Sequence, residues 1–393
     1  MPPRALSASF DPDAGNPTRQ VSIVTPQIDV YVSRRPLHAR ERALLLPDLE
    51  RRGISPSMLD VLPPAGRFFQ LLRAHSPDGD LVGVTSLMSF PPFVSIKQML
   101  GEGNHVGWDT SIYYAPDVDR PAVAGALLRA IARRSMYYGM YFGRIDEDIR
   151  AALPTIIHRL LRTDYQIGEI DCRSFASGDD FLAAHKRLRR NLRDHARSGG
   201  TVHVREGPVD WTLARRFSDL VHATYRHHGG VGRWQFGEYA RRTCASFFMN
   251  CEGAVHIYTV AADGRFTGLQ SYVRHRDRLE LSEGGFDRSQ ANHHAYEAIV
   301  AESVAYAAEH GLEAVGYGGI WNHTKDRYTE KAGREPVYLL QLYPSTLQYR
   351  LFGDRLSAWG FRQYFGGRFA GASGETSIES RQSRIPADID RRR

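Results

Sequence analysis

The order of secondary-structure patterns restricts the fold most, because one order occurs twice along the chain. Its first occurrence is a hairpin around Ser76-Pro77-Asp78-Gly79, a strand, a helix and a strand, at residues 68–89, 105–114, 122–138 and 140–145. The second has the same elements at residues 255–274, 279–283, 295–310 and 314–317. The two occurrences lie about 170 residues apart, which favours two copies of one unit over unrelated domains.

We therefore predict an α/β fold with a mixed sheet, built from two tandem domains at 21–175 and 176–370. Residues 1–20 and 371–393 are rich in Pro, Ser, Gly and charge without apolar periodicity, so we expect disordered ends. The patterns predict further strands at residues 21–32, 165–173 and 201–205. They predict further helices at residues 36–52, 148–162, 179–197, 211–226 and 236–249.

Composition excludes several classes of protein. The 393 residues carry 51 Lys and Arg against 44 Asp and Glu, a net charge of 51 − 44 = +7, with 42% hydrophobic residues, as in an ordinary globular protein. Three cysteines without CxxC spacing support neither a disulfide framework nor a zinc site. Apolar runs stay below the roughly 18 residues of a membrane span, and residues 1–20 lack the apolar core of a secretory signal. We expect a soluble, cytoplasmic protein without membrane insertion or a metal.

Several stretches resemble a known family, the tandem acetyltransferase-fold (GNAT) proteins that include the FemXAB aminoacyl-tRNA-dependent peptide transferases and the CelD/BcsL-type acyltransferases. The helix 185–193 looks like the basic helix that opens the family's second half. Residues 307–320, a helix end, a glycine, a strand and a Gly-Gly-Ile turn, are similar to the family's pattern, and 333–337 resembles its Phe-Gly-x-x-Pro-Val segment. In the first half, residues 138–146 are similar to the corresponding strand.

Two departures from the family pattern bear on the acyl donor. Tyr328 is followed by Thr329 where the family usually has Lys, and the nearest lysines are Lys325 and Lys331. The turn at residues 287–292, where single-domain acetyltransferases cradle the pyrophosphate of coenzyme A on backbone N–H groups, contains no glycine. The first departure removes a lysine to which the family pattern attributes a phosphate contact, and the second weighs against coenzyme A as the donor. Both keep open a non-catalytic binding protein.

The resemblance implies that the strands before and after the principal helix splay apart and bind the acyl group between them. Glu283 ends the first of these strands, where a carboxylate could orient an amine or act as a base; a surface position is the alternative. After the second strand, Gly318 and Gly319 could let the backbone approach the ligand closely. Tyr317, Asn322 and His323 could donate hydrogen bonds to an oxyanion or leaving group, and the alternative is a tight turn with ordinary polar residues. The pair His293-His294 is a helix start that could meet phosphate, and Asp146 with Asp148 predicts a helix cap.

Cations concentrate on one predicted helix. Lys186, Arg190, Arg193 and Arg197 recur on one helical face, and residues 185–197 carry six cations and one Asp, 6 − 1 = +5. Such a face suits an RNA backbone, and a solvated helix surface is the alternative. The loop 226–234 supplies His228, Arg233 and Trp234, which could close over an acceptor or stack on a base, or form a plain connection.

We thus expect an acyltransferase that forms an amide on a small-molecule or peptide amine, with aminoacyl-tRNA as cosubstrate and no tightly bound cofactor. An acyl-coenzyme A N-acyltransferase is the first alternative. A non-catalytic protein that uses the same fold to bind a precursor is the second. Motifs of P-loop nucleotide hydrolases, serine hydrolases and zinc proteases do not occur in the sequence.

Overall fold

The computed structural model describes most of both predicted units. The described residues are 27–33, 35–52, 56–59, 69–89, 98–100, 112–134, 139–143, 145–227, 245–287, 289, 294–319, 328 and 336–352. Both predicted disordered ends, 1–20 and 371–393, lie outside them.

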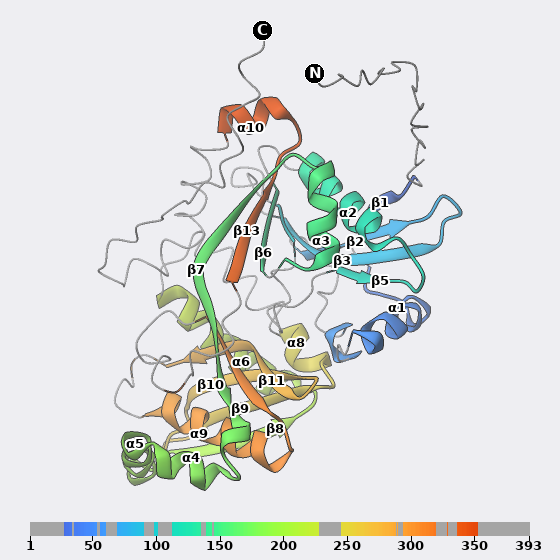
Figure 1. Cartoon of the computed structure of the whole chain (residues 1–393). Helices are drawn as coiled ribbons and strands as arrows, with labels where there is room; N and C mark the ends of the chain where they lie inside the picture. The colour runs from blue at the N-terminus through green and yellow to red at the C-terminus, as the bar shows by residue number, and fades with distance from the viewer. Residues whose placement is uncertain are drawn as a thin grey trace, which may run out of the picture.

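One 13-stranded mixed sheet runs through both halves of the chain (Figure 1). The strand that joins them is β7 (His158–Asp171), which pairs antiparallel with β13 (Pro336–Leu342) along its first part and with β12 (Ala314–Gly319) along its last. The strand order is β1-β2-β3-β4-β6-β13-β7-β12-β11-β10-β9-β8, with β5 also paired to β3. The expected fold class, α/β with a mixed sheet, is confirmed.

The first half contains an antiparallel meander, a crossover helix and a parallel strand. Its strands are β1 (Asp29–Ser33), β2 (Phe69–His75), β3 (Leu81–Ser89), β4 (Gln98–Leu100), β5 (Ile112–Tyr114) and β6 (Gly139–Gly143). Its helices are α1 (Ala39–Arg51), the 3₁₀ turn η1 (Pro56–Leu59), α2 (Arg120–Arg134), α3 (Glu147–Ala152) and the 3₁₀ turn η2 (Leu153–Thr155). Helix α2 connects β5 to β6, and β6 runs parallel to β4.

The second half repeats that order. Its strands are β8 (Thr201–Glu206), β9 (Ala254–Val260), β10 (Phe266–His275), β11 (Arg278–Phe286) and β12. Its helices are the 3₁₀ turn η3 (Cys172–Ser174), α4 (Gly178–Ala184), α5 (Lys186–Arg197), α6 (Trp211–His227), α8 (Ala245–Asn250) and α9 (Ala295–Glu309); α10 (Thr346–Phe352) follows β13. Helix α9 connects β11 to β12, which run parallel.

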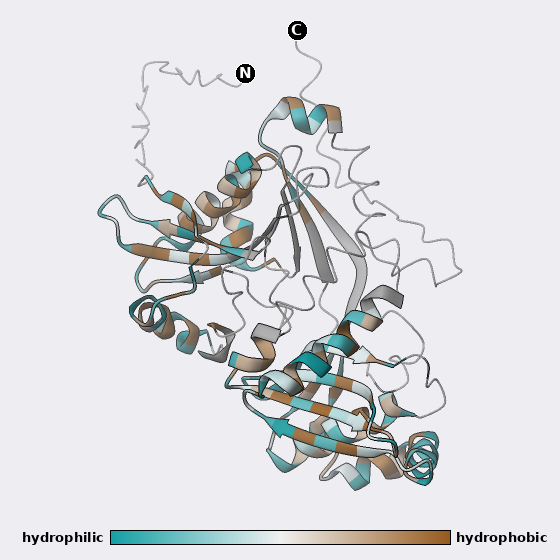
Figure 2. Cartoon of the chain, turned by 180° about the vertical axis from the view of Figure 1, so that it is seen from behind, coloured by the Kyte–Doolittle hydropathy of each residue, from teal (hydrophilic) through white to brown (hydrophobic). Residues whose placement is uncertain are grey.

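Three apolar clusters stabilise this arrangement. One lies under α2 in the first half and another under α9 in the second. The third joins α1, β2, β3 and β5 to α6, α8, β9 and β10, so that the two halves share a core. In the second half α6 and α9 cover opposite faces of the strands, and several of these strands alternate between hydrophobic and hydrophilic residues (Figure 2).

Several sequence expectations need correction. The helix expected at 148–162 ends early, because β7 begins at His158 and pairs with β13. The helix expected at 179–197 is two helices, α4 and α5, broken at His185, whose backbone is not helical (φ −118°, ψ 74°). Strand β13 was not expected, and it joins the first half's strands from the C-terminal side of the chain. The division into domains at 175/176 stays a prediction.

Candidate active site

The parallel strands β11 and β12 part after a short pairing. They pair only at Arg278 with Ala314, Leu279 with Val315 and Glu280 with Gly316, although β11 continues to Phe286 and β12 to Gly319. The start of α9 follows β11 at the same end of the sheet. This divergence is the one that the family resemblance implied.

A β-bulge lies in each strand where the two part. On β11, Tyr272 pairs with Leu281 but Ser271 pairs with Glu283, so Ser282 is the extra residue. Gly316 and Gly319 are three residues apart on β12, but their partners on β7, Glu169 and Ile167, are only two residues apart. Because a bulge bends its strand and increases the local twist, this pair of bulges accounts for the divergence.

Glu283 follows the β11 bulge and is buried, with 4% of its surface exposed, so a surface position is excluded. Its cross-strand partner is Ser271, and cross-strand partners share a face of the sheet. That face is the one covered by α6, because Gly285, two residues further, lies against the α6 backbone. Without the bulge, Glu283 would lie with Leu279 and Leu281 on the α9 face.

Beside Glu283 lies a buried pair of side chains that the sequence did not single out. Ser271 Oγ lies 2.9 Å from Nδ1 of His256 in β9, and Nε2 of His256 lies 3.2 Å from the carbonyl oxygen of Gly207. Burial lowers the pKa of His256 to about 4, so the ring is neutral at neutral pH. Since a carbonyl only accepts, Nε2 carries the ring proton and Ser271 donates to Nδ1. The alternation of Ala254, His256 and Tyr258 could have located this histidine on the α6 face.

Helix α6 holds the end of β11 in place. A Cβ added to Gly285 would lie 2.4 Å from the carbonyl carbon of Leu220 and from the backbone nitrogen of Val221. Thr224 accepts a hydrogen bond from Phe286 N at 2.8 Å and donates to Phe286 O at 3.3 Å. The close approach therefore depends on a glycine at 285.

Tyr317, which we expected to donate a hydrogen bond to an oxyanion, belongs instead to the apolar cluster under α9. Its side chain is buried under α9, where its hydroxyl bonds to Ser303 Oγ, and its ring meets that of Tyr272 edge-on. Burial raises its pKa well above the ordinary tyrosine value. Tyr317 is thus a core residue, whereas Gly318 and Gly319, which we expected in the turn after this strand, are the last two residues of β12.

Helix α5 exposes its cations. The expected carrier-binding residues Lys186, Arg190, Arg193 and Arg197 are all exposed, and Arg197 pairs with Asp194 at 3.3 Å. The buried side of the helix carries Leu188, Asn191 and His195. Asn191 donates to Glu297 Oε1 in the first turn of α9 at 3.1 Å, which ties α5 to the start of α9.

Six further candidates lie outside the described residues. They are His228, Arg233, Trp234, Asn322, His323 and Lys325. Of the histidine pair at the start of α9, His294 is described: it has a left-handed backbone (φ 51°) and lies 3.9 Å from Glu297.

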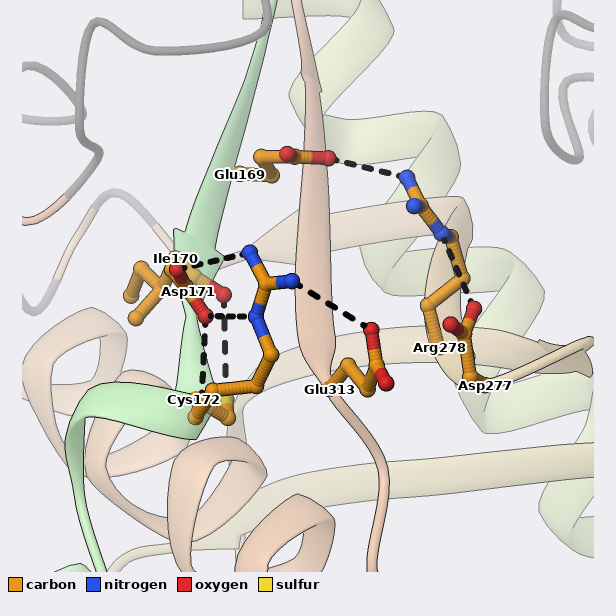
Figure 3. Close-up of polar contacts among 8 residues, drawn as sticks. Glu169, Ile170, Asp171, Cys172, Asp277, Arg278 and Glu313 are labelled. Carbon is orange, nitrogen blue, oxygen red and sulfur yellow. Dashed lines mark hydrogen bonds and ion pairs between the residues drawn. The ribbon is translucent and has the colours of Figure 1, made fainter.

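Ion pairs hold the opposite end of β11 and β12, where the two strands are paired (Figure 3). Arg278 bonds Glu169 of β7 at 2.9 Å, and Arg173 bonds Asp171 at 2.9 Å and lies 3.6 Å from Glu313. These contacts join the starts of β11 and β12 to β7. The divergence is therefore confined to the other end of the strands.

The described residues also bear on metals, thiols and membranes. They contain no group of His, Cys, Asp or Glu side chains arranged to hold a metal ion. Cys172 and Cys251 are buried cysteines, and burial raises the pKa of the Cys172 thiol to about 12. Asp146 accepts from Ile149 N at 2.7 Å and caps α3, as expected. Among the helices described, none has both the length and the hydropathy needed to cross a bilayer.

Part of the second half of the chain matches a known protein family. Residues 183–328, less than half of the chain, match the family described as "Acetyltransferase (GNAT) domain". This stretch extends from α4 to Tyr328 and includes the divergent strands, Glu283 and α5. No curated protein sequence matches the chain significantly.

Solved structures share the fold at low identity. L-PGS from Bacillus licheniformis is 13% identical, with a TM-score of 0.50 over 83% of this chain and 98% of that chain. The C-terminal domain of a putative lysylphosphatidylglycerol synthetase from Agrobacterium fabrum is 13% identical, with a TM-score of 0.45 over 84% and 98%. A crystal structure of FemX is 10% identical, with a TM-score of 0.44 over 79% and 92%. At 13% identity, the similarity to L-PGS concerns the fold alone.

The family match and the strand geometry agree on the second half of the chain. Residues 183–328 form an acyltransferase domain with the GNAT fold, and the protein is an acyltransferase.

Proposed function

We propose that the protein transfers an aminoacyl group from aminoacyl-tRNA to the amine of a small-molecule or peptide acceptor. The observation that carries the proposal is Glu283, a buried carboxylate directly after the bulge where β11 leaves β12. An acyltransferase acting on an amine needs a group that orients the amine and accepts its proton, and a carboxylate at this point can do both.

The reaction balances without a further reagent. The amine nitrogen forms a bond to the ester carbonyl carbon, and the bond from that carbon to the ribose oxygen breaks. Glu283 takes the proton that the amine loses, and the leaving ribose oxygen receives it. Backbone N–H groups near Gly318 and Gly319 are suited to the oxyanion, because no side chain blocks their approach.

The basic surface of α5 supports RNA as the carrier. Its exposed cations exceed its carboxylates by five across 185–197, and Asp194 pairs only with Arg197 among the contacts described for this helix. The phosphate backbone of RNA is the polyanion that such a stripe binds, and each contact releases counterions. The bond between Asn191 and Glu297 fixes this surface relative to the start of α9.

An acyl-coenzyme A N-acyltransferase is the second candidate function, and the family described as "Acetyltransferase (GNAT) domain" favours it. The turn at 287–292, which contains no glycine, argues against it. We also propose that the two halves are copies of one acyltransferase-like unit and that the protein works in a reducing, cytoplasmic compartment.

The donor is tested with radiolabelled aminoacyl-tRNA and a panel of amines, with and without ribonuclease, in parallel with acyl-coenzyme A thioesters. The proposal predicts amide product that disappears after ribonuclease treatment. Product that survives ribonuclease but requires a thioester would replace it with the coenzyme A candidate. Tight binding of a precursor without transfer from any donor would favour a binding protein.

The carrier surface is tested by the salt dependence of tRNA binding. Replacing Lys186, Arg190 and Arg193 with Ala should reduce the slope of log K against log salt by about 2 to 3, since each phosphate contact contributes about 0.7 to 0.9. The control variant replaces Arg133 and Arg134, two exposed cations in the last turn of α2. An unchanged slope in the triple variant, or an equal change in the control, would refute the assignment to α5.

A further inference from the structure

The first half contains a second pair of parallel strands beside a crossover helix. Strand β4 pairs with β6 at Met99 with Met140 and at Leu100 with Tyr141. Strand β4 pairs with residues 87–89 of β3, and β5 pairs with residues 83–85 of the same strand. The described pairings of β5 are with β3 alone. The end of β5, the end of β6 and the start of α2 thus correspond to the ends of β11 and β12 and the start of α9.

Charged side chains gather at this position, mostly out of contact with water. We call them the Tyr114 cluster: Asp48 and Arg52 from α1 and its end, Tyr114 from β5, Arg120 from α2, and Asp146 and Asp148 at the start of α3. Asp48 is fully buried and binds both guanidinium groups, that of Arg52 at 3.1 Å and that of Arg120 by a shorter contact. The two guanidinium carbons lie over the Tyr114 ring, 5.5 and 5.6 Å from its centre.

Two polar atoms in this cluster have no hydrogen-bond partner. The Tyr114 hydroxyl is fully buried and unpaired, and so is Oδ2 of Asp146, whose other carboxylate oxygen caps α3. Burial and the neighbouring carboxylates raise the pKa of Tyr114 well above its ordinary value, and burial also raises that of Asp146. Leaving a buried polar group unpaired is unfavourable, so these two atoms in one cluster point to a ligand group that binds them.

The charges of the cluster favour a cationic donor as its ligand. Two guanidinium groups and three carboxylates give 2 − 3 = −1. The cations already have acceptors: Arg52 bonds Asp48 and the carbonyl oxygen of Ile112, and Arg120 bonds Asp48 and lies 4.0 Å from Asp148. An anion would therefore find no donor that is not already engaged in these contacts. The carboxylates of the described residues are also not arranged around a metal position.

We propose that the Tyr114 cluster binds the protonated amine of a small primary amine. An ammonium group donates three hydrogen bonds and carries one positive charge. The Tyr114 oxygen, Asp146 Oδ2 and the Asp148 carboxylate supply three acceptors, and the ligand's charge balances the cluster. It enters beside Arg120 and Asp148, whose side chains are 25% and 23% exposed. The site belongs to the first half and is separate from the divergent strands that carry Glu283.

The test compares n-propylammonium with tetramethylammonium, which has the same charge and no N–H donor. Thermal unfolding and calorimetric titration are run at matched ionic strength. We expect n-propylammonium to raise the unfolding temperature and to give a binding isotherm, and tetramethylammonium to do neither. Equal effects of the two cations would overturn the proposal, because they would reflect charge alone.

Two conservative variants locate the site. Tyr114→Phe removes only the hydroxyl, and Asp146→Asn keeps an oxygen to cap α3; each should weaken n-propylammonium binding at least tenfold. Asp263→Asn, which alters an exposed carboxylate paired with Arg265 in the β9–β10 turn, should leave binding within twofold. Without amine, Tyr114→Phe should unfold at the same or a higher temperature than the wild type, because it removes an unpaired buried hydroxyl. Unchanged binding in both variants, or a lower unfolding temperature of Tyr114→Phe without amine, would refute the assignment. Binding is measured without acyl transfer, so its outcome is independent of the proposed reaction.

Discussion

Replacing Gly285 with Ala should disturb the candidate active site from a position outside it. The new Cβ would lie 2.4 Å from the Leu220 carbonyl carbon and from Val221 N, and 2.6 Å from the Leu220 carbonyl oxygen. Ordinary contacts of such atoms begin about 1 Å further apart. The obstructing atoms belong to the backbone of α6, so the clash cannot be relieved by turning a side chain, and α6 or β11 must move.

The magnitude follows from two contributions. Forcing a methyl group into a packed interface costs about 1 to 3 kcal/mol. Displacing α6 also strains the two hydrogen bonds between Thr224 and Phe286, each worth about 1 kcal/mol. We therefore expect Gly285→Ala to lower the free energy of unfolding by about 2 to 4 kcal/mol.

Gly284 provides the matched control, because a Cβ there would make ordinary contacts at 3.7 and 3.8 Å. Thermal and urea unfolding of the two variants and the wild type, followed by circular dichroism, measures the difference. Gly284→Ala should stay within about 0.5 kcal/mol of the wild type, as surface-like substitutions do. Equal stability of the two variants would refute the close packing of α6 on β11.

Three further predictions concern single side chains. Between pH 7 and pH 5, the free energy of unfolding measured in urea should fall by about 2 kcal/mol less for His256→Gln than for the wild type. The pKa of His256 is about 4 in the folded protein and about 6.5 in the unfolded chain, so protonation of the unfolded chain lowers the stability of the wild type as the pH falls through this window. The same fall in both proteins would contradict this. N-ethylmaleimide added to the native protein at neutral pH should not label Cys172, as measured by peptide mass spectrometry, because its raised pKa keeps the thiol protonated and burial shields it from the reagent. Labelling as fast as in denaturant would show that the thiol is accessible. Asn191→Ala should lower the free energy of unfolding by about 1.5 kcal/mol in the same urea assay, because it removes a partly buried hydrogen bond to the Glu297 carboxylate. Replacement of the exposed Arg193 by Ala should have little effect, and equal losses in the two variants would mean that this hydrogen bond contributes nothing.

Local sequence patterns predicted the elements whose contacts are close in sequence. The hairpins follow from turns at Gly79 and Gly264, both of which have positive φ, and the end of α9 from Gly311 (φ 64°). Helix α5 exposes its cations as their spacing predicted. These features depend on residues a few positions apart, which periodicity captures.

Contacts distant in sequence explain the elements that were missed. The start of β7 has apolar spacing that also suits a helix, and its pairing with β13, more than 150 residues away, decides for a strand. Tyr317 was expected to face a ligand, yet it lies two residues after Val315 on the same face, which the alternation of a strand could have shown. The face of Glu283 depends on one bulge at Ser282, which no pattern in the sequence marks.

The most direct test of the account is the single-turnover rate of amide formation by Glu283→Gln. As a control, Glu313→Gln alters a half-exposed carboxylate at the paired end of β12, 3.6 Å from Arg173. We predict that amide formation by Glu283→Gln is slower than by the wild type by a factor of about 10² to 10⁴. Thermal unfolding shows whether both variants are folded, and Glu283→Asp is the second variant if Glu283→Gln does not fold. Glu313→Gln should stay within about twofold, as expected for an uninvolved surface charge. A folded Glu283→Gln enzyme that keeps the wild-type rate would contradict the assignment of the reacting amine to the end of β11.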